Sequence, residues 1–239
     1  LKYKFNMRGD MFASVSNHIA EDYIERLSLS NVLCSRMKTI YNGIITENFP
    51  FSDKPEDYLL FLGRIKEGKA PHIAIKVALD SGHRIIVAGG NIPGSEDSQY
   101  EDKHYFNTEI EPLLGKNVEW YGPANLEQKV QLLRNAKAVL FPIQHNEALG
   151  LVPLESMACG TPVISFNKPG PNETIIDGKT GYLVDNNEQM VNAIFNIEKI
   201  NRRHCRNHIL TNFNYRKMGR LFTNLMDSMQ EESLNYNFR

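Results

Sequence analysis

Short, almost entirely apolar segments alternate with amphipathic segments along the middle of this chain, and this alternation constrains the fold more than any other feature. Short runs of β-branched and apolar residues are typical of strands, and the segments between them have the spacing of helices. Strands separated by helices predict an α/β fold with a doubly wound parallel sheet, whose strands are apolar throughout because helices cover both faces. The expected strands are residues 57–63, 83–90, 117–122, 136–142, 161–166 and 181–184.

The expected helices lie between and after these strands, at residues 69–79, 100–114, 126–134, 151–158, 188–200, 202–211 and 216–229. Ahead of the regular part, residues 12–16 and 38–42 have the composition of strands. Residues 17–27 between them are expected to form a helix with Asn17 as its N-cap. A polar stretch with two prolines at 47–57 is interpreted as a connection between domains.

The charge of the chain argues against partners that need a strongly basic protein. Its formal net charge is −1, so we expect no nucleic-acid partner and no bulk attraction to an anionic membrane. No apolar run approaches the ~20 residues of a membrane span, and no signal peptide is visible. We therefore expect a cytoplasmic protein. Because the chain begins with Leu1 instead of Met, we also expect that residues upstream are missing.

The cysteines and histidines do not form the spacings of a metal site. Cys34, Cys159 and Cys205 fit neither a zinc motif nor a disulfide framework, and we expect reduced, structural thiols. The seven histidines show no metal-ligand spacing either, so we predict no metal and no cofactor. His145, two residues before Glu147, is interpreted as a hydrogen-bonded bystander and not as an acid or base.

A basic loop, GRIKEGK, follows the first strand of the regular part. Ligands of doubly wound sheets bind beyond the carboxyl ends of the strands, so Arg64 and Lys69 would lie at the ligand-binding edge. A guanidinium grips phosphate oxygens with a fork of donors, and an ammonium adds a point charge. A solvated charged loop is the alternative, and the loop alone does not decide between the two.

The stretch NEALGLVPLESMACG is predicted to be a loop that enters a helix. Gly150 permits close approach of a ligand, and the free amides near Gly150, Leu151 and Val152 would form a cradle for an anion. Two acids flank this cradle, Glu147 before it and Glu155 inside the helix. Taken alone, Glu155 is explained as a first-turn glutamate that complements the helix dipole.

Two further glycine-containing stretches are less specific. In PGPNETIIDGKTGYLV, Asn172 and Glu173 are predicted to cap a short helix, with lining of the ligand cleft as the alternative. AGGNIPG places glycines after a strand, but no acid at the required spacing supports a dinucleotide fingerprint. No nucleophile elbow or Cys/His pair indicates nucleophilic catalysis.

The combination of these motifs is far more specific than its parts. Arg64 and Lys69 are followed about eighty residues later by Glu147 and Glu155, which are separated by seven residues and flank a glycine. This pattern resembles the retaining glycosyltransferases of family 4 (glycosyl transferases group 1), which have the GT-B fold. The similarity is carried by FLGRIKEGKAPHIAIKVALDSGHRIIVAGG, by HNEALGLVPLESMACGTPVIS and by DGKTGYLV.

The resemblance implies a catalytic or binding role for each matching charged residue. In that family, the residues matching Arg64 and Lys69 hold the diphosphate of a nucleotide-sugar donor. The glutamate matching Glu155 binds the ribose hydroxyls, and the one matching Glu147 lies beside the transferred sugar. Charge neutralisation by the basic residues and the helix would stabilise the leaving diphosphate, so no metal is required.

The resemblance also implies contacts that do not depend on charged side chains. The amides after the glycine matching Gly150, here those of Leu151 and Val152, contact phosphate or sugar. The loop that begins at Tyr121 and Gly122 borders the base. Of the motif residues, only Leu149 departs from the pattern, because the family usually has an aromatic residue there. We expect this substitution to alter the sugar pocket without removing nucleotide binding.

The resemblance divides the chain into three parts. Residues 1–47 match the end of the amino-terminal acceptor domain and the crossover from it. Residues 48–229 match the Rossmann-like domain that binds the nucleotide sugar, with its C-terminal helices. Residues 230–239 form a polar tail that is expected to be frayed. Nearly all of the acceptor half would then be missing, and His18 lies in the wrong segment to replace the family's catalytic histidine.

Three hypotheses follow. The first is the donor-binding part of a retaining glycosyltransferase, which transfers a hexosyl group from a UDP-sugar, or alternatively a GDP-sugar, to an unidentified sugar, lipid or small-molecule acceptor. It would be inactive without the missing half, through which it would associate peripherally with a membrane. The second is a non-catalytic nucleotide-sugar binding module or an inactive remnant. The third is a glycosidase that uses Glu147 and Glu155 as a carboxylate pair, but such an enzyme does not need Arg64 and Lys69.

Overall fold

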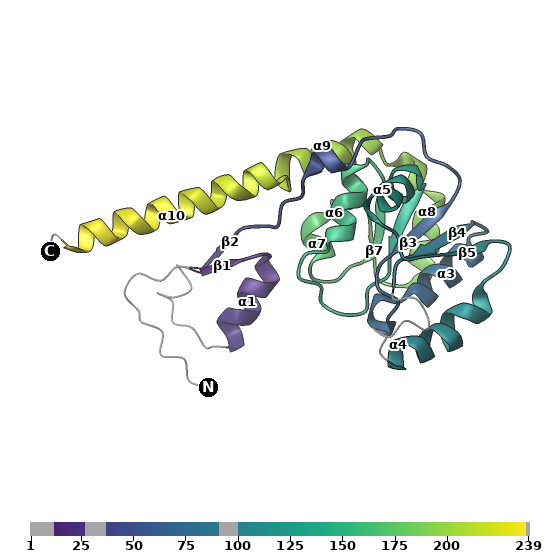
Figure 1. The fold of residues 1–239 in the computed structure, drawn as a ribbon. Helices are drawn as coiled ribbons and strands as arrows, with labels where there is room; N and C mark the ends of the chain where they lie inside the picture. Colours follow the sequence, from purple (N-terminus) through teal and green to yellow (C-terminus); the bar gives the residue numbers. More distant parts are fainter. Residues whose placement is uncertain (1–11, 27–36, 91–99, 238–239) are drawn as a thin grey trace.

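The computed structural model describes residues 12–26, 37–90 and 100–237, which form a large sheet domain and a small amino-terminal unit (Figure 1). The sheet domain has six parallel strands in the order β5-β4-β3-β6-β7-β8. The strands are β3 (Leu59–Leu62), β4 (Ile85–Ala88), β5 (Val118–Gly122), β6 (Ala138–Phe141), β7 (Val163–Phe166) and β8 (Gly181–Val184). All six agree with the expected positions, and the predicted doubly wound parallel sheet is confirmed.

The centre of the sheet is buried on both faces. Every residue of β3, β4, β6 and β7 is buried, as the continuous apolar runs predict. Strand β3 pairs with β4 on one side, where Phe61 lies opposite Val87, and with β6 on the other, where Leu60 lies opposite Val139. These strands form the hydrophobic core of the domain.

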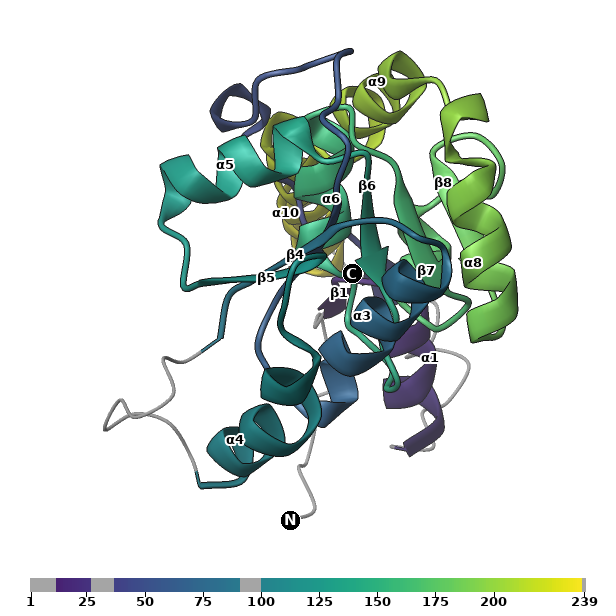
Figure 2. The same ribbon diagram turned by 90° about the vertical axis from the view of Figure 1, so that its right-hand side faces the viewer.

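Helices cover both faces of the sheet (Figure 2). On one face α3 (Pro71–Asp80) packs on α8 (Asn187–Phe195), and on the other α6 (Leu151–Ala158) packs on α5 (Leu126–Asn135) and α9 (Arg202–Asn212). Helix α5 begins with a capping box, in which Asn125 accepts from the Gln128 amide and the Gln128 side chain accepts from the Asn125 amide.

Two expected elements differ from the prediction. Residues 100–114 are not one α-helix: α4 (Tyr100–Tyr105) continues as a π-helical turn (Phe106–Ile110) and a 3₁₀ turn (Glu111–Leu113). Pro112 explains the irregular end, because it lacks an amide hydrogen and its ring crowds the carbonyl of the preceding turn. The expectation of a frayed tail is also wrong, since α10 (Tyr215–Asn237) runs through most of it. Extension of an existing helix requires no new nucleation, and this polar segment contains good helix formers.

The small unit consists of β1 (Phe12–Ser14), α1 (Asn17–Arg26) and β2 (Met37–Thr39). The two strands pair in parallel and form a sheet of their own. From β2 the chain runs along the start of α10, where the Gly43 amide donates to Met218 Sδ at 3.2 Å and the Ile44 amide donates to the Phe213 carbonyl at 2.9 Å. The long α10 extends from the sheet domain toward β1 and β2 (Figure 1).

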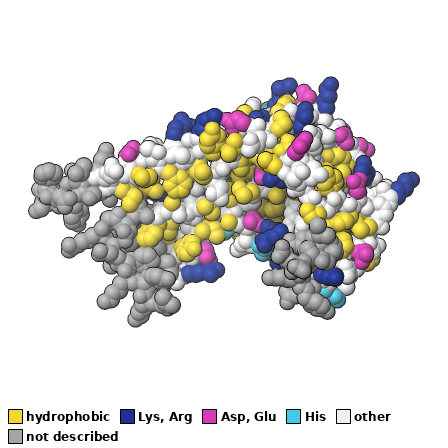
Figure 3. Space-filling view, in the orientation of Figure 1, with side chains coloured by type: hydrophobic (Ala, Val, Ile, Leu, Met, Phe, Trp, Pro, Cys, Tyr) yellow, Lys and Arg dark blue, Asp and Glu magenta, His cyan; other side chains and the backbone are white. Residues whose placement is uncertain are grey.

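Two features of the surface bear on function. The molecule is hollowed between the small unit and the sheet domain, and acidic, basic and histidine side chains lie at the hollow (Figure 3). Apolar side chains gather along α10 on the same face (Figure 3). Helix α10 contains the exposed apolar residues Leu221, Phe222 and Met226, which are 39%, 41% and 61% exposed.

Candidate active site

The strand order places the two charged motifs at the point where the chain reverses its direction of travel across the sheet. From β3 the chain proceeds outward to β4 and β5, and then returns to the other side of β3 to form β6. In open α/β sheets, ligands bind in the crevice that forms at such a reversal. We call the corresponding position here the crevice, and the loops after β3 and β6 border it. They carry Arg64 and Lys69 on one side and Glu147 and Gly150 on the other.

The loop after β6 is tied to the loop after β3. The Gly68 carbonyl accepts from the Gln144 amide at 2.9 Å and from His145 Nδ1 at 3.0 Å. Because a carbonyl only accepts, the bond to Gly68 requires a proton on His145 Nδ1. The other ring nitrogen, Nε2, lies 3.6 Å from Glu147 Oε2. His145 is hydrogen bonded, as predicted, and it also joins the two loops of the site.

The glycines after β4 have a packing function. A Cβ atom on Gly89 would lie 2.3 Å from the Gly63 carbonyl oxygen, and one on Gly90 would lie 2.4 Å from Ile65 Cγ1. Only glycine permits this approach of the loops after β3 and β4. Close packing of the loops therefore explains Gly89 and Gly90 without a dinucleotide ligand. The rest of AGGNIPG, from residue 91, lies outside the described residues.

Helix α6 presents its N-terminus to the crevice, as the cradle prediction requires. Gly150 is its N-cap with φ +87°, a conformation that side chains disfavour. Within the described part of the chain, no acceptor is bonded to the amides of Leu151 and Val152. Leu149, by contrast, is only 1% exposed and belongs to the hydrophobic core. Its effect on the sugar pocket stays a prediction.

Lys69 and Glu147 form an ion pair across the crevice. Their side chains are 14% and 23% exposed, and the Lys69 ammonium lies 5.8 Å from the centre of the Phe141 ring at the end of β6. The bond uses Glu147 Oε2, and Oε1 has no hydrogen bond to any described residue. The structure thus brings the predicted lysine and glutamate together directly.

Glu155 forms a second ion pair, with a residue that the sequence analysis missed. Lys129 Nζ in α5 lies 2.7 Å from Glu155 Oε1, and the two side chains are 25% and 13% exposed. Glu155 Oε2 has no hydrogen-bond partner in the described ranges. Nothing in the sequence around Lys129 distinguishes it from an ordinary surface lysine, because the contact depends on the packing of α5 against α6.

Arg64 and Tyr121 lie at the same edge without direct contact with these pairs. Arg64 is exposed, and its guanidinium makes no hydrogen bond or ion pair with another described residue. Tyr121, 36% exposed, and Gly122 end β5, where the Gly122 carbonyl accepts from the Gly89 amide at 2.8 Å. An unpaired guanidinium at the crevice is available to an anionic ligand.

Glu173 has a different role from the one predicted. It lies in α7 (Pro171–Thr174), but its carboxylate caps α1, where it accepts from the Asn17 and His18 amides at 2.8 and 3.1 Å. His18 Nδ1 at 3.0 Å and the Tyr41 hydroxyl at 3.0 Å also donate to it. The prediction that Asn17 is the N-cap is therefore wrong: Asn17 is the first helical residue, and a carboxylate from another helix satisfies its amide.

The environment of the Glu173 carboxylate and the Tyr41 hydroxyl shifts the pKa values of both groups. Burial by itself raises the pKa of Glu173, but the hydrogen bonds from Asn17, His18 and Tyr41 outweigh it and leave that pKa below its usual value. Burial, followed by the bond to Glu173, raises the pKa of Tyr41 to about 12. At neutral pH an ionised Glu173 thus faces a protonated Tyr41.

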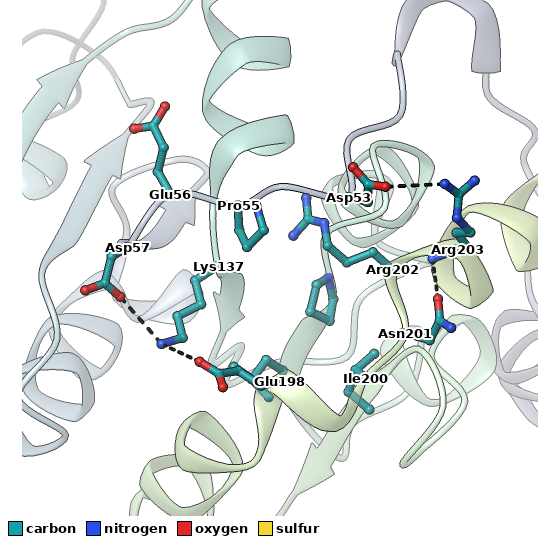
Figure 4. A pocket seen from close by; sticks show the side chains of 12 residues that line it. Asp53, Pro55, Glu56, Asp57, Lys137, Glu198, Ile200, Asn201, Arg202 and Arg203 are labelled. Carbon is teal, nitrogen blue, oxygen red and sulfur yellow. Dashed lines mark hydrogen bonds and ion pairs between the residues drawn. The ribbon is translucent and has the colours of Figure 1, made fainter.

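A cavity of about 520 Å³ lies at the opposite, amino-terminal edge of the sheet (Figure 4). Five of its charged side chains form ion pairs with one another: Lys137 lies 3.5 Å from Asp57 and 3.3 Å from Glu198, and Arg203 lies 3.3 Å from Asp53. In the described six-stranded sheet, the carboxyl ends of the strands lie at the other edge. This cavity is therefore a weaker candidate for an anionic ligand than the crevice.

Arg202, which also lines this cavity, has a structural function. Its guanidinium donates to the carbonyls of Ser52 at 2.8 Å, Ala136 at 3.0 Å and Arg134 at 2.8 Å, and to Thr161 Oγ1 at 2.6 Å. Burial lowers the pKa of Arg202. The sequence alone does not reveal this role, because the groups that Arg202 joins come from three segments that lie far apart in the chain.

The described residues contain no group of three or more His, Cys, Asp or Glu side chains placed to hold a metal ion. Cys159 and Cys205 are buried free thiols, and Cys34 lies outside the described residues. Among the helices that the structure describes, none has the length and apolar composition needed to span a membrane.

Comparisons with known proteins are consistent with this geometry. The family model of glycosyl transferases group 1 matches residues 45–209. The D-inositol 3-phosphate glycosyltransferase of Mycolicibacterium smegmatis is 31% identical over 174 residues, which cover 68% of this chain and 39% of that relative. The enzyme of the same name from Mycobacterium sp. (strain KMS) is 30% identical over 174 residues with the same coverage. This chain thus spans about two fifths of these relatives.

Solved structures show the same fold. Anabaena HepE in complex with UDP superimposes with a TM-score of 0.77 at 18% identity, covering 91% of this chain and 64% of that one. Sucrose-phosphate synthase from Thermosynechococcus elongatus gives a TM-score of 0.73 at 22% identity, covering 90% of this chain and 58% of that one. With the family match across the sheet domain and its crevice, these likenesses identify the chain as a member of the glycosyl transferases group 1 family, whose structures have the GT-B fold.

Proposed function

We propose that this chain is the donor-binding part of a retaining glycosyltransferase of family 4 that uses a UDP-sugar. The observation that carries the proposal is the arrangement at the β3–β6 crevice: an Arg64 guanidinium with no partner among the described residues, the Lys69–Glu147 pair and the open N-terminus of α6. A diphosphate needs several converging donors, and sugars need acceptors for their hydroxyls. The crevice offers both kinds of group.

The donor diphosphate would lie against the amides of Leu151 and Val152, with Arg64 and Lys69 on its other side. Lys69 can serve both partners, because an ammonium has three donors and Glu147 uses one of them. Positive charge that is already in place stabilises the negative charge that develops on the leaving diphosphate. No side chain has to move a proton to this leaving group.

The two glutamates would bind the polyhydroxy ends of the donor. Each has one carboxylate oxygen engaged by a lysine and one with no partner among the described residues. We assign the free oxygen of Glu155 to the ribose and that of Glu147 to the transferred hexosyl group, and we place the base near Tyr121 and Gly122. UDP is favoured because HepE is a UDP complex of the same fold, with GDP as the alternative.

The acceptor, the whole protein's activity and its location stay predictions. We propose that the 239-residue chain binds the donor but transfers sugar poorly, because it spans only 39% of the matched relatives. The acceptor site and any peripheral membrane contact are assigned to residues beyond this chain. The expected cytoplasmic location belongs to the same proposal.

Of the two other hypotheses, the glycosidase receives less support from the site. A glycosidase needs two carboxyl groups that face one bond, whereas Glu147 and Glu155 belong to separate ion pairs with Lys69 and Lys129. A non-catalytic binding module would share the whole crevice. It is distinguished by the absence of transfer when an acceptor-binding half is supplied.

Calorimetric titration with UDP, GDP and ADP tests the proposal. We expect UDP to bind, and Arg64→Ala to weaken UDP by at least about tenfold while uridine is affected little, because one charge-assisted contact is worth ~1.5–3 kcal/mol. Arg220→Ala removes another exposed arginine from α10 and serves as the matched control. Absence of binding by all three nucleotides, or equal losses for UDP and uridine, would refute the assignment.

A further inference from the structure

Glu173 connects the small unit to the loop that carries Glu147. We propose that Glu173 is a positioning residue, which transmits the placement of the β1–α1–β2 unit to the backbone of Glu147. The proposal rests on the proposed function for the role of Glu147 beside the sugar. The connection itself depends only on the contacts described below.

On the side of the small unit, the Glu173 carboxylate is held by four donors from α1 and the segment after β2. These are the amides of Asn17 and His18, His18 Nδ1 and the Tyr41 hydroxyl, at 2.8 to 3.1 Å. The Tyr41 hydroxyl in turn accepts from Asn17 Nδ2 at 2.8 Å. The side chains of Glu173 and His18 are 12% and 16% exposed. Since every neighbour donates, the position requires a group that only accepts.

On the side of the crevice, the residues just before Glu173 hold the Glu147 backbone. The Glu147 amide donates to the Pro169 carbonyl at 3.2 Å. Gly170 has φ +94°, and a Cβ atom there would lie 2.4 Å from the Glu147 carbonyl oxygen. The Glu173 amide donates to the Gly170 carbonyl at 3.1 Å. Three residues thus separate the carboxylate that holds α1 from the contact that holds Glu147.

This short connection has a consequence for the site. A shift of α1 relative to the sheet domain would displace α7, because Glu173 of α7 is bonded to the start of α1. Helix α7 would in turn displace Glu147, because Gly170 packs directly against the Glu147 backbone. Helix α7 also packs against α6, whose N-terminus forms the amide cradle. The position of Glu147 therefore depends on the seating of the small unit on Glu173 as well as on the ion pair with Lys69.

Amide hydrogen exchange, measured residue by residue by NMR on the full chain, tests this connection. In Glu173→Gln we expect exchange at the Asn17 and His18 amides to rise by about tenfold or more, because a charge-assisted bond is lost. We also expect a several-fold rise at the Glu147 amide. Glu127→Gln alters an exposed first-turn glutamate of α5 and should change none of these amides.

A pair of His18 variants tests the same contact without altering Glu173. His18→Asn keeps a nitrogen donor near the position of Nδ1, whereas His18→Leu removes it. We expect wild-type exchange at Glu147 in the first and faster exchange in the second. Equal behaviour of the two variants, or faster exchange at Asn17 with no change at Glu147 in Glu173→Gln, would show that Glu173 merely caps α1. Failure of the wild-type chain to bind UDP would overturn the proposed function and leave this comparison intact.

Discussion

Gly150 offers the sharpest test of the amide cradle, because its replacement by alanine adds one carbon atom and no charge. Its φ of +87° costs a non-glycine residue ~1–2 kcal/mol, and the stiffer unfolded chain returns ~0.4–1 kcal/mol. A Cβ atom would also lie 3.3 Å from Pro153 Cγ and 3.4 Å from its Cδ, so we expect Pro153 and the first turn of α6 to shift by a few tenths of an ångström. We expect Gly150→Ala to lower the free energy of unfolding by about 1–3 kcal/mol.

The matched control is Gly82→Ala. Gly82 has a similar φ of +74°, but a Cβ atom there would meet nothing within 4 Å, and the residue lies in the turn before β4, away from the crevice. This variant carries the same conformational cost of about 1 kcal/mol without the contact to Pro153. In a chain of this size, 1 kcal/mol corresponds to a fall of about 2–4 °C in Tm. The two variants share this conformational cost, and Gly150→Ala should lose more stability because only it has the contact with Pro153.

Ligand binding should separate the two variants clearly. Displacement of the Leu151 and Val152 amides removes bonds of ~1.5–3 kcal/mol each to a charged oxygen, so UDP should bind Gly150→Ala at least about tenfold more weakly. Uridine, which lacks the diphosphate, should bind both variants like the wild type. The assay is calorimetric titration below the unfolding transition, alongside urea unfolding. Unchanged UDP affinity in Gly150→Ala, or an equal loss in Gly82→Ala, would refute the cradle.

Three further outcomes follow from buried polar groups. Arg202→Met leaves one buried and two partly buried carbonyls without their donor and should destabilise the chain by about 3–5 kcal/mol, measured by urea unfolding. A loss under 1 kcal/mol would contradict the structural role. Burial raises the pKa of Cys159 and Cys205 to about 12, so iodoacetamide should label them only after unfolding, as mapped by peptide mass spectrometry. The pKa of Glu173 lies below its usual 4.5 in the folded chain, so its stabilising contribution is present above that pH and lost below it. The stability difference between wild type and Glu173→Gln should therefore shrink as the pH falls below about 4.5, and a difference independent of pH would contradict the ionised cap.

Much of the fold could be predicted because its signals are local. The apolar runs that form β3, β4, β6 and β7 identify themselves by composition, and the helices between them by periodicity. The errors lie where a local signal is weak. The π-helical turn from Phe106 and the helical tail to Asn237 differ from regular or frayed helix by small energies, which the local sequence does not resolve.

The candidate site was predictable in part for a different reason. Arg64, Lys69, Glu147 and Gly150 follow strands directly, so parallel topology alone brings them to one edge of the sheet. Their roles toward a ligand are still predictions. Lys129 could not be found in this way, because it lies within a helix and faces Glu155 only through the packing of one helix on another.

The sequence by itself determined the parallel sheet, its doubly wound character and the edge at which charged residues gather, because hydrophobic periodicity and strand–helix alternation act over short distances along the chain. Only the tertiary structure decided the partners: that Lys69 joins Glu147, that Leu149 enters the core, and that Glu173 caps α1. The residues that meet in the last contact are separated by 156 positions in the chain. Such contacts depend on the crossing of whole elements, and a hydrogen bond between distant residues leaves no periodic signal in the sequence.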